Sequence, residues 1–242
     1  MRALLIISFL FLSNNIIGQP IKIDTLKVKL SDQITESGFE ENNYYPLIKT
    51  GDKKIDSLIN FDLKNKVSYN EFPNENIEST LNKWAAYGLV FLDFKVNYNK
   101  NGILSLRIDG EGCSAYCTHW SNYYNYSTVT GQVLELSDIV DLAYLKQDII
   151  KKKNEQYQRN RERLKKQLAE DDGLYESEYN LILERYNECD NDFEINQFAL
   201  FKDHIEIIEN CYLPHIFTPS TPIIEIQYKL SDIKDYLKIK DD

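Results

Sequence analysis

LDFKVNYNKNGILSLRID, residues 92–109, is the stretch that decides the fold. From position 92 to 98, and again from 104 to 108, every second residue is apolar and the residues between are polar or charged. This period of two predicts two amphipathic strands, each with one face toward a core and one toward water. Asn101-Gly102 is a turn signal between them. The stretch therefore predicts an antiparallel β-hairpin.

Further strand signals follow the hairpin and recur near both ends of the chain. A loop with two cysteines leads into a strand expected over residues 120–129, and Thr130-Gly131 turns the chain into another over residues 133–136. Three or four consecutive antiparallel strands are therefore expected in the middle of the chain. The other extended segments are expected over residues 25–30, 44–48, 193–202, 204–212 and 222–228.

Helical patterns separate these groups of strands. Apolar residues at helical spacing predict a helix that begins after the capping residue Asp52, a shorter one over residues 74–86 and a long one from Ser137. Another helix is expected over residues 175–187, and a capped terminal helix over residues 231–237.

The expected fold class is α+β, an antiparallel sheet with packed helices. The sequence shows no internal repeat and no low-complexity linker. We therefore expect a single domain over residues 44–242, preceded by an N-terminal extension over residues 19–43.

Residues 151–187 are expected to form a charged helical hairpin that projects from this domain. The apolar stripe of the long helix thins beyond Lys151, and Gly173 breaks the helix. Nine basic residues lie between positions 146 and 166, and ten acidic residues between 170 and 194. Opposite charges on the two arms stabilise such a hairpin by mutual attraction. The alternative is that the basic arm forms a binding face.

The first 18 residues are typical of a cleavable signal peptide. Arg2 supplies a positive start, residues 3–12 are apolar, and a more polar segment ends in the small residue Gly18. The apolar run is too short for a membrane-spanning helix, which needs about 20 residues. We expect cleavage after Gly18 and a secreted or periplasmic protein without an integral membrane anchor.

The composition indicates an acidic globular protein. The 242-residue chain has 28 basic and 38 acidic residues, and removal of Arg2 with the signal peptide leaves 27 against 38, a net charge of −11. This charge disfavours nucleic acid as a partner and favours encounter with a basic one. It is also an ordinary device for solubility.

Four cysteines in an exported chain predict two disulfides. Four cysteines allow three pairings, and we favour Cys113 with Cys117 and Cys189 with Cys211, because the first two are close and the others bracket an expected hairpin. A zinc site is the alternative, since Cys113, Cys117 and His119, with Cys211 and His215, have suitable spacings. An oxidising compartment argues against zinc, so neither a metal nor a cofactor is expected.

The sequence lacks the common catalytic signatures. Nucleophile-elbow, phosphate-loop, zinc-protease and dinucleotide motifs are all missing. Four residues close together in the sequence offer paired carboxylates or a Cys–His pair: Asp109, Glu111, Cys117 and His119. Their spacing matches no specific catalytic motif, and the Cys117 thiol is expected in a disulfide. We therefore expect a protein that is not an enzyme.

An aromatic group is the most suggestive candidate binding site. Trp120, Tyr124 and Tyr126 fall on one face of an expected strand, and Tyr116 lies in the adjoining loop. Aromatic platforms stack on sugars and anchor protein interfaces. The alternative is that these rings cover the core.

Four stretches of the chain resemble a known bacterial domain. They are YPLIKTGDKKIDSLIN (45–60), FKVNYNKNGILSLRI (94–108), YNYSTVTGQVLELSDIV (124–140) and PIIEIQYKLSDIKDYL (222–237). Over residues 44–238 they resemble an extracytoplasmic domain family of unknown function, found beside some peptidoglycan deacetylases and as the lysozyme-sensing C-terminal domain of the RsiV anti-sigma factor. The chain departs from RsiV in lacking a transmembrane segment and a sigma-binding region, and no binding residue transfers by motif.

These features together predict an exported, non-enzymatic binding domain of the cell envelope. The resemblance implies an envelope protein or glycan as partner, with a basic protein such as a lysozyme as the leading candidate. The alternatives are a carbohydrate- or peptidoglycan-binding module that uses the tyrosine-rich strand, and an envelope hydrolase.

Overall fold

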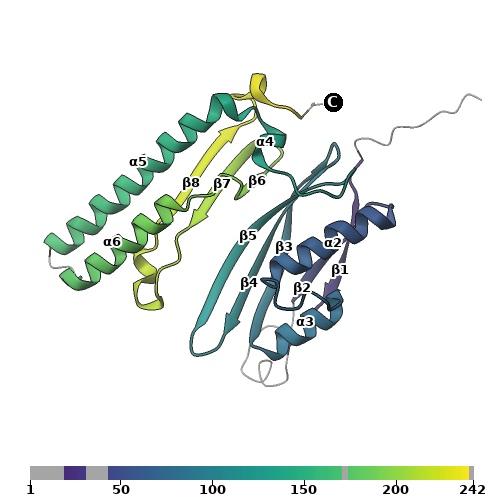
Figure 1. The fold of residues 1–242 in the computed structure, drawn as a ribbon, viewed down its shortest axis with the longest axis horizontal. Helices are drawn as coiled ribbons and strands as arrows, with labels where there is room; N and C mark the ends of the chain where they lie inside the picture. Colours follow the sequence, from purple (N-terminus) through teal and green to yellow (C-terminus); the bar gives the residue numbers. More distant parts are fainter. Residues whose placement is uncertain (1–18, 31–42, 171–173, 240–242) are drawn as a thin grey trace, which may run out of the picture.

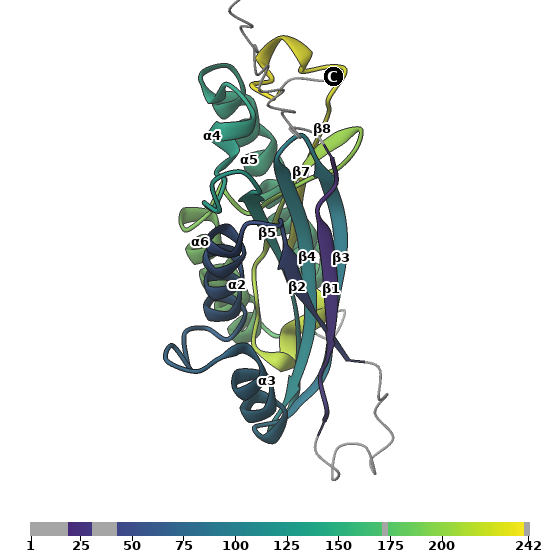
Figure 2. The ribbon, with the colours of Figure 1, turned by 90° about the vertical axis from the view of Figure 1, so that its right-hand side faces the viewer.

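The computed structural model describes residues 19–30, 43–170 and 174–239. The α+β class expected from the sequence is confirmed, with antiparallel sheets and packed helices. The strands lie in one layer, and the helices form a second layer on one side of it (Figure 2). The expected signal peptide, residues 1–18, lies outside the described residues.

The first half of the fold ends with β5. Its strands form two antiparallel sheets, in the orders β1-β2 and β3-β4-β5, and its two helices lie over them (Figure 1). In chain order the elements are β1 (Lys22–Lys27), β2 (Tyr44–Lys49), α2 (Lys53–Val67), α3 (Ile77–Ala86), β3 (Leu89–Lys100), β4 (Ile103–Cys113) and β5 (Cys117–Ser127).

The second half contains the remaining elements around a core of its own. Its antiparallel sheet has the order β6-β7-β8. The elements are α4 (Leu136–Ile139), α5 (Leu142–Ala169), α6 (Glu176–Asn191), β6 (Phe198–Leu200), β7 (His204–Asn210), the 3₁₀ turn η1 (His215–Ser220), β8 (Ile223–Lys229) and the 3₁₀ turn η2 (Lys234–Tyr236).

The hairpin predicted from residues 92–109 is confirmed as β3 and β4. Its turn is Asn101-Gly102, where both residues have positive φ, 54° and 74°. The first half has its own hydrophobic core, here called the first core, and the core of the second half is called the second core. Leu104, Leu106 and Ile108 are fully buried in the first core, beneath α2 and α3. Asp52 begins α2 as expected, since its side chain accepts hydrogen bonds from two backbone N–H groups.

Several sequence expectations about local structure were wrong. Residues 133–136 contribute only an isolated bridge from Val133 to Tyr126, so three strands rather than four follow one another. The helix expected from Ser137 is divided, because the chain becomes extended at Val140 and Asp141 caps a new helix. The expected terminal helix is only the short turn η2.

The prediction of a projecting hairpin over residues 151–187 is corrected by the packing of α5 and α6. Both helices lie along the sheet β6-β7-β8 (Figure 1). Tyr157, Leu164, Ile182 and Tyr186 are at most 1% exposed and belong to the second core. The stripe looks thin because tyrosines form part of it. Their rings are buried while their hydroxyls donate hydrogen bonds, from Tyr157 to Glu209 Oε2 and from Tyr186 to a backbone carbonyl.

Polar contacts join the two halves beside β6. The Asn125 side-chain amide donates to the carbonyl oxygen of Phe198 at 2.7 Å, and the backbone N–H of Leu200 donates to Ser105 Oγ at 3.1 Å. Tyr123 on β5 donates its hydroxyl proton to Glu206 Oε1 on β7 at 2.8 Å.

Within the described ranges, none of the helices has the length and apolar character needed to span a membrane.

Candidate functional site

Three neighbouring cavities open along β5 where it faces the second half. The first has a volume of about 490 Å³, the second about 210 Å³ and the third about 650 Å³. The first two share the lining residues Asn122, Tyr123, Glu194 and Gln197, and the second and third share Tyr212. We call this continuous groove the β5 cleft. It follows β5 from Asn125 to Cys117.

One wall of the β5 cleft is the outer edge of a strand. β5 is the last strand of its sheet and pairs with β4 on one side only. On the other side, Asn125 accepts a hydrogen bond from the N–H of Leu134. Because backbone groups alternate in direction along an antiparallel strand, the N–H and C=O groups of Tyr123, Ser121 and His119 also point away from β4. This part of the edge has no backbone partner among the described residues.

The lining of the cleft is acidic. Carboxylates occur in all three cavities: Glu135 and Glu194 in the first, Glu194, Asp192 and Glu209 in the second, and Glu111 in the third. Lys66 is the only Lys or Arg among the described lining residues, and its ammonium lies 2.9 Å from Asp62 Oδ2. The cleft therefore attracts cations.

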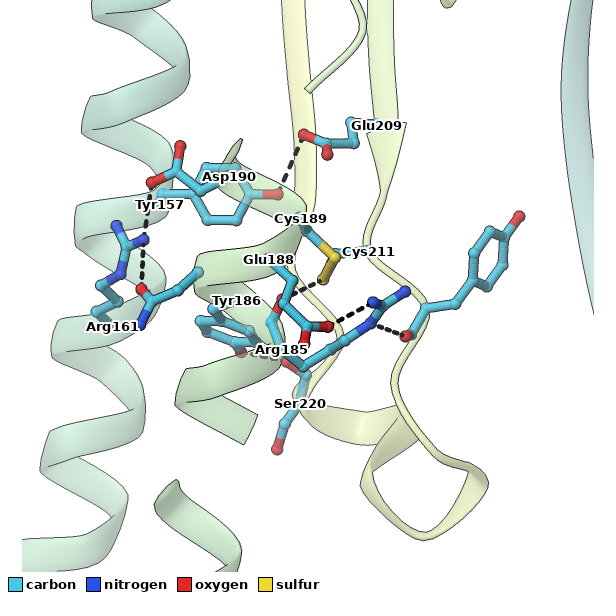
Figure 3. Close-up of a disulfide and its surroundings, with 12 residues drawn as sticks. Tyr157, Arg161, Arg185, Tyr186, Glu188, Cys189, Asp190, Glu209, Cys211 and Ser220 are labelled. Carbon is cyan, nitrogen blue, oxygen red and sulfur yellow. Dashed lines mark hydrogen bonds and ion pairs between the residues drawn. A yellow bond between two sulfur atoms is a disulfide. The ribbon is translucent and has the colours of Figure 1, made fainter. Parts of the chain in front are cut away.

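Glu209 lies at the inner wall in a network that fixes α5 and α6 to β7 (Figure 3). Tyr157 donates to its Oε2 at 3.1 Å. Burial raises the pKa of Glu209 from 4.5 to about 7, and the negative charges of Asp190 and Asp192 add to this effect, whereas the Tyr157 hydrogen bond opposes it. Asp190 itself is held by Lys153 at 2.6 Å and Arg161 at 2.7 Å.

The raised pKa of Glu209 predicts a stability change between pH 5 and pH 8. The folded state binds this proton more tightly than the unfolded chain, so the stabilisation is complete below about pH 4.5 and is lost as the pH rises through about 7. Because Glu209 is partly exposed, we expect a change of only about 1 kcal/mol. Urea unfolding at pH 5 and pH 8 should show this change in the free energy of unfolding in the wild type but not in Glu209→Gln. The matched control is Glu155→Gln, an exposed position on α5, which should keep the wild-type pH dependence; an unchanged dependence in Glu209→Gln would contradict the assignment.

The aromatic residues proposed from the sequence are mostly in the core. Trp120, Tyr124 and Tyr126 do share a face of β5, but this face is directed toward the first core, and they are 9%, 7% and 0% exposed. Only Tyr116 is well exposed, at 66%, and its ring stacks on His215 with centroids 4.9 Å apart. Tyr123 and Glu209 also line the cleft, and neither is among the candidate residues identified from the sequence. The strand patterns around them do not indicate that residues of β5 and β7 line one cleft.

Both disulfides favoured from the sequence are present, Cys113–Cys117 and Cys189–Cys211. The first closes the β4–β5 hairpin at the third cavity, and the second ties α6 to the end of β7 (Figure 3). The alternative zinc site lacks its thiolate ligands, because all four sulfur atoms are oxidised. His119 and His215 nevertheless line the same third cavity.

The carboxylates considered for catalysis make contacts within the hairpin of β4 and β5. Asp109 accepts hydrogen bonds from Arg107 at 2.9 Å and from Ser121 Oγ at 2.6 Å. Glu111 lies opposite His119 in the register of β4 and β5, beside the oxidised Cys113 and Cys117. These contacts hold the outer face of the hairpin and do not assemble a nucleophile with a base.

Comparison with solved structures identifies the fold of the chain. No family model and no curated protein sequence matches the chain. A solved structure of a DUF3298 family member from Bacteroides fragilis is similar over 91% of this chain and 94% of its own, with 16% identity and a TM-score of 0.50. The chain has the fold of DUF3298 domains. A DUF3298 family protein from Pseudomonas aeruginosa covers 91% of this chain and 95% of its own, with 13% identity and a TM-score of 0.48.

At this level of identity the DUF3298 likeness concerns the fold alone. It accords with the bacterial domain family of unknown function that the sequence resembles, and it brings no functional residue to this chain.

Proposed function

We propose that this protein is an exported, non-catalytic binding domain of the bacterial cell envelope, and that its ligand occupies the β5 cleft. The observation that carries the proposal is the cleft itself, where an unpaired strand edge and five carboxylates line a groove between the two halves. The two disulfides and the signal-like N-terminus support export.

A basic envelope-active protein is the leading candidate for the ligand. The acidic lining and the net charge of −10 of the full chain favour association with a cationic partner. The sequence also resembles the domain by which RsiV senses lysozyme. We therefore choose lysozyme as the first probe.

The mature protein, residues 19–242, is expected to bind lysozyme with a dissociation constant of about 1 µM or tighter, roughly −8 kcal/mol. Raising the salt from about 50 to 500 mM should weaken binding, because ions screen surface charge. Isothermal titration calorimetry measures both effects.

Matched variants test whether the cleft is the contact. Asp192→Asn with Glu194→Gln removes two exposed carboxylates from the cleft and should weaken binding about tenfold, since each charge aids association. Glu176→Gln with Glu178→Gln changes the charge equally on α6, away from the cleft lining, and should have little effect. An absence of heat at 100 µM protein in low salt would exclude lysozyme as the ligand.

A glycan is the second candidate, because amide side chains and tyrosines gather in the first cavity. Its lining includes Asn122, Asn196 and Gln197 together with Tyr69 and Tyr123. Such groups suit hydroxyl-rich ligands. Retention of the mature protein on insoluble peptidoglycan at high salt would favour this candidate, whereas turnover of glycan or peptide substrates would indicate the envelope hydrolase.

A further inference from the structure

We propose that β5 receives an additional strand from a basic partner, an extended segment rich in lysine or arginine that enters the β5 cleft and pairs with the free edge of β5. The inference rests on the proposed function, since it names the kind of ligand that occupies the same cleft.

The chain itself shows that this edge of β5 accepts a strand. At one end of β5, residues 132–134 pair with it antiparallel: Ser127 N–H donates to Gln132 O, and Leu134 N–H donates to Asn125 O. This pairing stops at Asn125. The next outward-facing residues, Tyr123, Ser121 and His119, present the same pattern of donors and acceptors to the cleft. A further strand would continue the ladder that residues 132–134 begin.

The opposite wall of the cleft is also an incompletely paired strand. β6 pairs with β7 only from Ile205 to Ile207, followed by one hydrogen bond from Ile208 N–H to Gln197 O. Beyond this point Ile208 and Glu209 line the second cavity. A chain in the cleft therefore lies between the sheet β3-β4-β5 and the sheet β6-β7-β8.

The volume of the cleft suits an extended segment. One strand residue occupies about 3.3 Å along the strand, 4.8 Å between strands and 10 Å across the layer, or roughly 160 Å³. The third cavity alone, of about 650 Å³, therefore has room for about four residues.

The charge of the cleft selects a basic segment. Asp192, Glu194 and Glu209 line the second cavity, and no Lys or Arg does among the described lining residues. Burial raises the pKa of Glu209, and the neighbouring carboxylates add to this effect. A lysine or arginine at alternate positions of an added strand would compensate them. A second copy of this chain, with the same acidic cleft, is disfavoured by its own charge.

A buried polar group supports a ligand at this place. Asn125 lines the first cavity and is only 5% exposed. Its amide nitrogen donates to Phe198 O, but its Oδ1 has no hydrogen-bond partner within the described residues. Leaving such an acceptor without a partner is costly, and an incoming N–H or ammonium group at the start of the free edge would satisfy it.

The test uses synthetic peptides and the mature protein, residues 19–242. The probe is a capped nine-residue peptide of alternating lysine and threonine; the controls replace lysine by glutamate, or carry N-methyl groups on alternate backbone nitrogens. We expect micromolar binding of the basic peptide in low salt, and at least tenfold weaker binding of both controls. Amide hydrogen exchange at His119, Ser121 and Tyr123 should slow when the basic peptide binds.

A proline variant separates strand pairing from simple charge attraction. His119→Pro removes one outward-facing N–H without removing a bond to β4, a change tolerated at a sheet edge. It should weaken peptide binding at least tenfold, and clearly more than His119→Ala, which removes the same side chain but keeps the N–H. Circular dichroism and disulfide content check that both variants are folded.

Each outcome decides the inference separately from the proposed function. Equal binding of the N-methylated and unmodified basic peptides, or unchanged exchange at the three amides, would overturn strand addition. So would an absence of basic-peptide binding at 100 µM. If lysozyme still binds and this binding depends on Asp192 and Glu194, the cleft remains the binding site and only the mode of recognition is wrong. If the peptide binds and protects the three amides but lysozyme does not bind, strand addition stands and the partner is another basic protein.

Discussion

Replacing residues 153–184 with a short glycine–serine link is expected to prevent the second half from folding. The replacement removes Tyr157, Leu164 and Ile182, which are 0–1% exposed within the second core. Loss of each buried side chain costs about 2–5 kcal/mol, and the stability of a typical domain is only about 5–15 kcal/mol. Circular dichroism and urea unfolding measure the loss.

The matched control for this deletion changes exposed charges on the same helices. Lys165→Gln with Glu176→Gln should alter the free energy of unfolding by about 0.5 kcal/mol or less, because both side chains are exposed. A shortened protein that still unfolds cooperatively with wild-type stability would show that α5 and α6 are dispensable after all.

Gly88→Ala is expected to destabilise the first half by about 3–5 kcal/mol. Gly88 has a φ of +105°, and an added Cβ would lie 2.2 Å from the backbone carbonyl oxygen of Cys113. The contact is difficult to relax, because Cys113 N–H donates to Gly88 O at 2.8 Å and Cys113 is held by a disulfide. Thermal and urea unfolding report the change.

Gly51→Ala separates the backbone strain from the clash. Gly51 has a similar φ of +95°, but an added Cβ meets nothing within 4 Å. This variant should lose only about 1–2 kcal/mol, the cost of a left-handed conformation for alanine. Equal losses in the two variants would mean that Cys113 moves away from the new methyl group at little cost.

Three local signals in the sequence each predicted their element correctly. The alternation through residues 92–109, the Asn101-Gly102 turn and the cap at Asp52 each depend on neighbours within a few positions. The structure has all three. The two disulfides were also accessible, because each joins cysteines that are consecutive in the chain.

The candidate site was less accessible from sequence because it depends on contacts between distant segments. Tyr123 and Glu206 are 83 positions apart and meet only when the two halves of the chain pack together. Alternation showed that Trp120 and Tyr124 share a face, but it does not tell which face of a strand meets the core. The edge that stays unpaired in a sheet is likewise a property of strand order.

The buried tyrosines of α5 and α6 explain the error about the hairpin. Tyr157 lies where the apolar stripe of the long helix thins, and Tyr186 lies on the next helix, yet both are among the largest fully buried side chains. Their hydroxyl groups find acceptors on β7 and at Ser220, so burial does not leave these two hydroxyls without a partner.

The pairing of consecutive cysteines has a consequence for oxidative folding. During the export that the N-terminus predicts, Cys113 and Cys117 leave the translocation pore before Cys189 and Cys211, and each native bridge closes within one half of the fold. An oxidase that joins thiols in their order of emergence therefore produces the native pairs directly. Maturation should then proceed in cells that lack a disulfide isomerase.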